Sequence, residues 1–208
     1  VFKNIFDATA ANMVSGNSMS NLYFKGRSSW NGFEADDLSG FMDDLVARPE
    51  IDILLARKPD NRVKILSSKG SAQTWIDTDN NINYEVTDAD PFGYEPLPRV
   101  MSSSESLKRS YGTDYPDALL QINQLFDSPR AGDIVVSANP GYDLRAKHEN
   151  PEHCSSHGSL HRDHMIVPIA INTEISKDYI RTVDLFPTVL ELLGYELPAN
   201  LDGKSLAN

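Results

Sequence analysis

The sequence is poor in cysteine and in long apolar runs. Its single cysteine, Cys154, excludes an internal disulfide and any zinc cluster built from several cysteines. No apolar stretch approaches the roughly 18–20 residues that cross a bilayer, and the opening VFKNIFDATAANM lacks the basic-then-apolar order of a signal peptide. We therefore expect no membrane segment, and any metal site must use nitrogen and oxygen ligands.

Basic residues are also scarce relative to acidic ones. Nineteen Lys and Arg stand against 30 Asp and Glu, which gives a formal net charge of −11. Such a chain repels nucleic acid and anionic membrane surfaces unless a local patch reverses the field. We expect no binding to nucleic-acid polymers, and an anionic substrate would need something other than side-chain charge to attract it.

The apolar residues that are present alternate between helical and strand patterns. With 208 residues and 40% hydrophobic content, the chain is long enough to bury a core. The spacing of apolar residues and the turn signals predict helices at 34–46, 116–127 and 182–194, and strands at 19–25, 51–56, 62–67, 134–136 and 166–172. Pro168 argues that the last of these is an edge or interrupted strand.

Alternating helices and buried strands indicate an α/β fold in layers. Residues 50–100 carry two strand pairs joined by turn signals, which predicts a small β-rich antiparallel lobe inserted in that fold. The segment 88–103, with three prolines and no periodicity, reads as a loop.

The histidines are concentrated in one segment. The chain has five, and four of them fall in HCSSHGSLHRDH at 153–164, with His148 just upstream. Imidazole is the commonest nitrogen ligand of zinc, and α/β sheets place their sites in loops at the carboxyl ends of buried strands. The strand at 134–136 leads into this segment, which favours a metal site there. The alternative is a polar surface loop that is merely rich in histidine.

Two other readings of the segment concern nucleophiles. Ser155, Ser156 and Ser159 flank His157, with Asp163 nearby, but no G-x-S-x-G elbow is present, and catalytic triads are assembled in space rather than along the chain. Cys154 stands beside His153, yet a lone cysteine is more often a small buried residue than a nucleophile. We favour neither reading.

Three stretches together resemble a known family. These are SSHGSLHRDHMIVPI (155–169), RTVDLFPTVLELLG (181–194) and YELPANLDGKSL (195–206). Their order and spacing are similar to the C-terminal portion of the alkaline phosphatase superfamily. GDIVVSANPGYDLR followed by SSHGS is closest to the type I phosphodiesterase and nucleotide pyrophosphatase branch.

The resemblance implies a layered α/β/α core, here partial, with 130–208 as its C-terminal segment and 1–208 as a single partial domain. It also implies a centre of two divalent metal ions, in this branch zinc, acting on small-molecule phosphoesters. His157 matches the family's last metal ligand. His153, His161, Asp163 and His164 are candidates for orienting the ligands or contacting substrate.

The family's other ligands, its Asp-His-Gly signature and its Thr or Ser nucleophile find no match in these 208 residues. Asp163 and His164 form an Asp-His pair, but it follows His157 and is succeeded by Met165. We therefore expect a C-terminal fragment of a metal-dependent phosphodiesterase that is inactive by itself. The alternatives are a sulfatase, a phosphoglycerate mutase of the cofactor-independent type, and a non-catalytic binding domain that keeps the fold.

Overall fold

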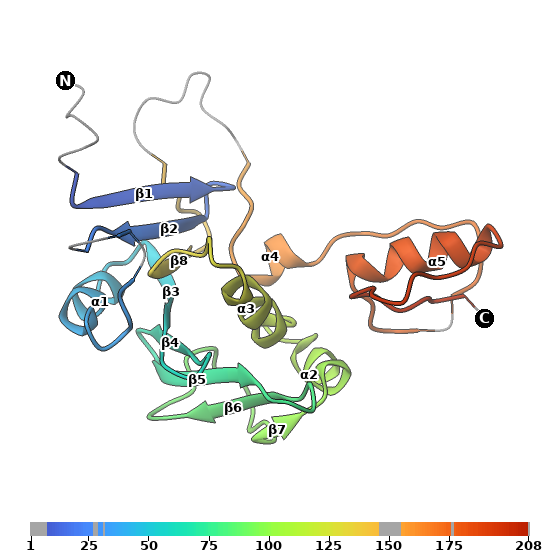
Figure 1. Ribbon diagram of the computed structural model, residues 1–208, viewed down its shortest axis with the longest axis horizontal. Helices are drawn as coiled ribbons and strands as arrows, with labels where there is room; N and C mark the ends of the chain where they lie inside the picture. Colours follow the sequence, from blue (N-terminus) through green and yellow to red (C-terminus); the bar gives the residue numbers. More distant parts are fainter. Residues whose placement is uncertain (1–7, 27–28, 31, 146–154, 176, 208) are drawn as a thin grey trace. The chain divides into compact units, whose positions relative to one another are not determined.

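The computed structural model describes residues 8–26, 29–30, 32–145, 155–175 and 177–207. These residues form two compact units, which meet in the sequence between Ile166 and Val167. The first unit contains a β-sheet with helices packed on it, and the second contains a single main helix (Figure 1).

The first unit is built on one eight-stranded sheet. In chain order its strands are β1 (Ala10–Ser15), β2 (Met19–Phe24), β3 (Ile51–Arg57), β4 (Val63–Ser67), β5 (Gly70–Ile76), β6 (Ile82–Val86), β7 (Val100–Met101) and β8 (Ile134–Ala138). Their order across the sheet is β1-β2-β8-β3-β4-β5-β6-β7, and every neighbouring pair of strands is antiparallel.

Strands β8 and β3 are buried because both faces of the sheet are covered at this point. On one face, Met42 of α1 (Ser39–Val46) packs with Leu54 of β3 and Val136 of β8. On the other, α3 (Ala118–Asp127) packs its apolar side on Val135 and on the inward residues of β4 and β5. The continuous apolar sequences of these strands reflect burial on two sides.

The predicted elements are largely present, with adjusted bounds. Helix α1 begins at Ser39, five residues later than expected from the acidic start at Glu34, and α3 begins two residues after the expected Pro116. The loop expected at 88–103 ends in the short strand β7 and leads into α2 (Ser103–Ser110), whose first turn is capped by the Ser102 hydroxyl.

The prediction of a strand at 166–172 is wrong. These residues form neither a helix nor a strand, and Val167 is 52% exposed. Pro168 has no N–H to donate to a ladder, so an apolar run around it cannot join a sheet as an ordinary strand does.

The expected fold class is confirmed only at the level of a mixed α/β protein. The antiparallel strands predicted at 50–100 exist as β3 to β7, but they continue edge to edge into β8 and do not pair among themselves alone. A buried apolar run such as 134–136 is typical of parallel strands and of doubly covered antiparallel ones alike, so its sequence does not distinguish them. The layered core of the alkaline phosphatase type stays a prediction.

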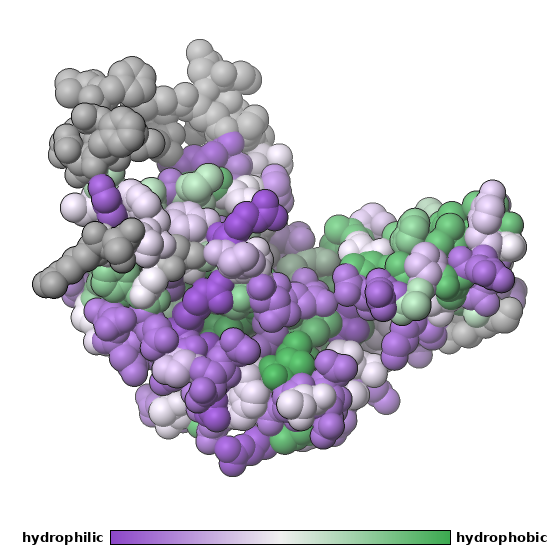
Figure 2. Space-filling model, in the orientation of Figure 1, coloured by the Kyte–Doolittle hydropathy of each residue, from purple (hydrophilic) through white to green (hydrophobic). Residues whose placement is uncertain are grey.

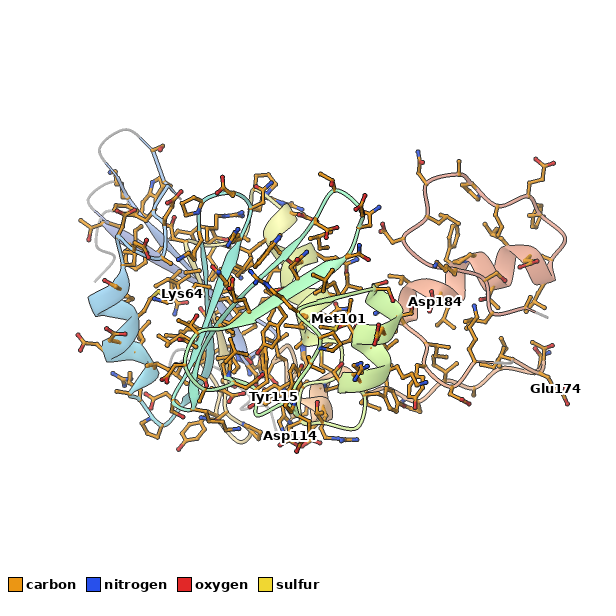
Figure 3. The ribbon with its side chains drawn as sticks, turned by 90° about the horizontal axis from the view of Figure 1, so that it is seen from below. Lys64, Met101, Asp114, Tyr115, Glu174 and Asp184 are labelled. Atoms are coloured by element: carbon orange, nitrogen blue, oxygen red, sulfur yellow. The ribbon has the colours of Figure 1, made fainter. Side chains whose placement is uncertain are left out.

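The second unit is held together by polar contacts around α5 (Leu185–Leu192), which follows a single 3₁₀ turn, Thr182–Asp184. The Asp184 carboxylate (labelled in Figure 3) accepts hydrogen bonds from the backbone N–H groups of Arg181 and Lys204, at 2.9 and 2.8 Å. The buried Thr188 hydroxyl accepts from Leu206 N–H at 2.9 Å. These bonds tie the tail to the helix.

Gly203 lies against the 3₁₀ turn that precedes α5. A Cβ atom on it would stand 2.0 Å from the carbonyl oxygen of Val183, so only glycine fits. The stretches RTVDLFPTVLELLG and YELPANLDGKSL thus have a local structural cause: Asp184, Thr188 and Gly203 fasten the tail onto α5 and the turn before it.

Apolar side chains gather on the surface of the second unit, over α5 and its flanks (Figure 2). The exposed residues include Phe186 at 57%, Leu193 at 66% and Tyr195 at 64%. Within the described ranges, no helix has the length and apolar content needed to cross a membrane.

We predict that Thr188→Val destabilises the second unit by about 1–3 kcal/mol, because it leaves the buried N–H of Leu206 without an acceptor while keeping the side-chain shape. Amide hydrogen exchange of Leu206 measures this directly. The exposed Thr182→Val serves as the control and should change stability by less than about 0.5 kcal/mol. Unchanged protection of Leu206 in Thr188→Val would refute the assigned bond.

Candidate functional site

Residues 155–165, here called the histidine segment, cross one end of the sheet. Both neighbours of β8 run antiparallel to it, so its carboxyl end meets the start of β2 at Met19 and the start of β3 at Ile51. The histidine segment is fixed at this end by contacts with the β1–β2 turn, with β8 and with the connection between α2 and α3.

The first of these contacts holds His157. Its N–H donates to Gly16 O at 3.0 Å and its carbonyl accepts from Ser18 N–H at 3.1 Å, which makes a short parallel bridge with the β1–β2 turn. Asn17 Nδ2 donates to Ser155 O at 3.3 Å, and the hydroxyls of Ser18 and Ser156 are hydrogen-bonded to each other. The backbone of His157 is therefore fixed, while its side chain is exposed.

Two glycines allow this close approach. Gly16 has φ +68°, and a Cβ atom on it would lie 2.5 Å from His157 Nδ1. Gly158 has φ +99°, and a Cβ atom there would lie 2.9 Å from Ser15 O. Both conformations favour glycine over residues with a side chain. The Gly that follows His157 is thus required by the path of the backbone.

Further along, Leu160 N–H donates to Ser137 Oγ of β8 at 3.1 Å, and Arg162 N–H donates to Asp114 O at 2.7 Å. The Arg162 guanidinium also donates to Thr113 O at 3.1 Å. These bonds fasten the second half of the histidine segment across the sheet.

Ser159, which is buried, and His164 form a hydrogen-bonded pair. Ser159 is 2% exposed, and its Oγ lies 2.7 Å from His164 Nδ1. Burial, followed by the neighbouring His161, lowers the pKa of His164, so its ring is neutral and can accept this bond. Ser159, one of the three serines considered as nucleophiles beside His157, is therefore bonded to another histidine and shielded from solvent.

His161 caps the single turn α4 (Arg162–Met165). Its Nδ1 accepts from Asp163 N–H at 3.3 Å and lies 3.5 Å from the exposed Asp163 carboxylate. Its ring stands edge-on to Tyr115, with 6.1 Å between centroids. His161 and Asp163 are thus brought together, and the His161 ring contacts Tyr115.

Behind Tyr115 lies a buried carboxyl group that the sequence patterns did not single out. Ile51 pairs with Ala138 and Ile53 with Ser137, so Asp52 is an extra residue in a β-bulge. Its Oδ1 accepts from the Tyr115 hydroxyl at 2.8 Å, while Oδ2 is buried and accepts no hydrogen bond from the described residues. Asp114 and Tyr115 are labelled in Figure 3, next to each other at this end of the molecule.

Burial raises the pKa of Asp52, and the Tyr115 hydroxyl together with the charges of Lys69 and His161 opposes that rise. A signal for this residue was present: IDILLA places one aspartate in an otherwise apolar strand. A charged residue in a buried strand marks either strain or a site.

The described residues do not make up a complete metal site. No group of three or more His, Cys, Asp or Glu side chains among them could hold an ion. His157 is placed at the sheet end, whereas His161 and His164 point to Tyr115 and Ser159. His148, His153 and Cys154 lie outside the described residues. A zinc site needs three or four ligands, which this part of the chain does not provide.

Comparison with protein-family models, curated proteins and solved structures finds no match to this chain. The resemblance therefore rests on the motifs themselves.

We predict that Asp52→Asn becomes more favourable relative to the wild type as the pH rises from about 4 to 7. A carboxyl whose pKa is raised by folding contributes most stability below its unfolded-state pKa and loses that contribution as the pH passes its folded-state pKa. The amide keeps an acceptor for Tyr115 and carries no charge. Urea unfolding at both pH values measures the difference.

Asp79→Asn, at an exposed position, is the matched control and should show no such trend. A difference between wild type and Asp52→Asn that stays constant over this pH range would contradict the assignment of Asp52 as a buried, costly charge.

Proposed function

We propose that this chain is the C-terminal part of a metal-dependent phosphoester hydrolase of the phosphodiesterase and nucleotide pyrophosphatase type. His157 is proposed to supply one imidazole ligand to a two-metal centre. The other ligands and the nucleophile are proposed to come from residues outside these 208.

The observation that carries this proposal is the placement of His157. Its backbone is bonded on both sides to the turn that meets the carboxyl end of β8, and its ring is exposed beside Gly16. A ligand of a metal shared with other segments needs a fixed backbone and a free imidazole. The Ser159–His164 and His161–Asp163 contacts support it by fixing the segment that follows.

A bound metal centre would also explain how an acidic chain can bind an anionic substrate. Bound divalent ions reverse the local field, so a protein of net charge −11 can take an anionic phosphoester. In this proposal His157 neither donates nor accepts the reacting proton, because its lone pair is used to hold an ion.

The motifs of the second unit support the family resemblance without bearing on chemistry. Asp184, Thr188 and Gly203 are occupied in fastening the tail to α5. The resemblance implies that sulfatases and phosphoglycerate mutases share this helix and tail, so these residues do not separate the alternatives. Only the nucleophile distinguishes those alternatives from a phosphodiesterase.

We predict that purified 1–208 shows no zinc-dependent hydrolysis of bis(p-nitrophenyl) phosphate above background, because it lacks the nucleophile and most ligands. In the product of the complete reading frame, His157→Ala should lower kcat/KM by at least about 100-fold, since even residues that only orient ligands contribute 10 to 100-fold. Release of p-nitrophenol measures both.

Turnover by 1–208 that depends on His157 would overturn the proposal that the centre is incomplete. A complete reading frame without a Thr or Ser nucleophile and the missing aspartates would favour the non-catalytic binding domain. Activity of the complete product that is indifferent to His157→Ala would refute its role as a ligand.

A further inference from the structure

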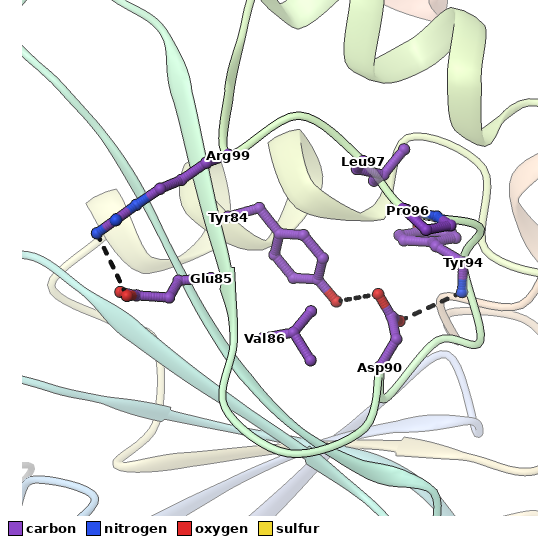
Figure 4. A pocket seen from close by; sticks show the side chains of 8 residues that line it. All are labelled: Tyr84, Glu85, Val86, Asp90, Tyr94, Pro96, Leu97 and Arg99. Carbon is purple, nitrogen blue, oxygen red and sulfur yellow. Dashed lines mark hydrogen bonds and ion pairs between the residues drawn. The ribbon is translucent and has the colours of Figure 1, made fainter.

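A cavity of about 460 Å³ opens in the first unit, between strand β6 and the segment 90–99 (Figure 4). Small-molecule sites have volumes of about 300–1,000 Å³. The cavity opens where these two segments diverge. Tyr84 N–H donates to Arg99 O at 2.9 Å, next to the short β6–β7 ladder. The prolines at 91, 96 and 98 cannot donate to a ladder, which explains why the segment separates from β6.

Asp90 is fixed at one end of this cavity. Its Oδ1 accepts from the N–H groups of Phe92 and Tyr94, at 2.9 and 3.3 Å, and its Oδ2 accepts from the Tyr84 hydroxyl at 3.0 Å. Three bonds hold the carboxylate without neutralising it. Among the described residues, no lysine, arginine or histidine forms an ion pair with Asp90.

Two tyrosine rings form the inner wall beside Asp90. The rings of Tyr84 and Tyr94 lie 6.3 Å apart between centroids and are inclined by 68°. Burial, and then the negative charge of Asp90, raises the pKa of both phenols, so both rings stay neutral. The face of a neutral aromatic ring attracts cations.

The remaining charges of the cavity cancel. Glu85 and Arg99 form an ion pair at 3.3 Å at the end away from Asp90, as Figure 4 shows. With that pair neutral, Asp90 gives the lining a net charge of −1. Val86, Pro96 and Leu97 complete the lining with apolar surface.

We propose that this cavity binds a small organic cation, with its ammonium group beside Asp90 and near the ring of Tyr84 and a short apolar stem against Val86, Pro96 and Leu97. An anion would meet the charge of Asp90 unfavourably. A bare metal ion would find one carboxylate where it needs several ligands, and no cluster of three exists among the described residues. The site does not depend on the proposed metal centre.

The test is a titration of ¹⁵N-labelled 1–208 with n-butylammonium chloride and, separately, tetramethylammonium chloride, followed by ¹H–¹⁵N NMR. We expect saturable shifts of the Val86 and Tyr94 amides with a Kd of about 1 mM for at least one cation. Tighter binding of the primary amine would assign the main contribution to hydrogen bonds with Asp90, and tighter binding of the quaternary one to the ring faces. n-Butanol and sodium chloride at equal concentration should give no saturable shift.

Asp90→Asn should weaken binding at least about tenfold, a loss of about 1.4 kcal/mol. Its amide oxygen can still accept from Phe92 and Tyr94. Asp88→Asn removes the same charge at an exposed position and should change Kd less than about twofold.

A second pair of variants leaves Asp90 and its bonds in place. Val86 is 40% exposed on the lining, so Val86→Lys places an ammonium group at the cavity and should also weaken binding at least about tenfold. Thr87→Lys adds the same charge at an exposed position just after β6 and outside the lining of the cavity, and should have little effect.

Three results would overturn the proposal. One is the absence of saturation by either cation up to about 50 mM. Another is equal binding of n-butanol, which would make the cavity merely apolar. The third is equal weakening by Asp90→Asn and Asp88→Asn, which would reduce the effect to the overall charge of the chain.

Discussion

Strand β8 lies between β2 and β3 and runs antiparallel to both, and the rest of the candidate site depends on this pairing. Because strands of opposite direction meet at their opposite ends, the carboxyl end of β8 meets the β1–β2 turn on one side and the first residues of β3 on the other. His157 is fixed to that turn, and Asp52 stands in the bulge at the start of β3. The pairing of β2, β8 and β3 thus brings residues that are distant in the sequence to the same end of the sheet.

At this end the first half of the histidine segment, 155–160, is hydrogen-bonded to the β1–β2 turn and to β8, and only its last residues form the single turn α4. Ser137, Ser18 and Gly16 provide acceptors and donors for Leu160 and His157. This explains why a segment rich in serine and glycine, both poor helix formers, has a defined path. It also separates the histidines by role: His164 and His161 are used in local contacts, whereas the imidazole of His157 is left exposed.

Much of the fold could be predicted from local patterns. The turn KPDN between β3 and β4 and the sequence around Asp79 and Asn80 give hairpins whose register follows from turn chemistry. What the sequence did not provide was the order of strands across the sheet, because that order depends on pairings between segments more than 100 residues apart, such as Asn21 with Val135. The antiparallel direction of β8 follows from the same long-range pairings, whereas the short strand β7 forms by pairing with β6, as Ile82 does with Met101.

The site was predictable in part for a related reason. His157 carries a motif, so the sequence points to it, whereas Asp52 and Tyr115 become neighbours only when β3 and the α2–α3 connection come together. Ser155, Ser156 and Gly158 are poor helix formers, and the described residues 155–161 form no helix that would place the histidines on one face. Asp90 is recognisable as a site residue only because the chain folds back on β6.

The central claim is that the histidine segment is held at the carboxyl end of β8 with the His157 ring against Gly16. The most direct measurement is a nuclear Overhauser spectrum of isotope-labelled 1–208 in solution. The account predicts cross-peaks between the His157 ring protons and the α-protons of Gly16, together with slow exchange of the Ser18 and Leu160 amides. Absence of those cross-peaks, with both amides exchanging as fast as in an unfolded peptide, would contradict it.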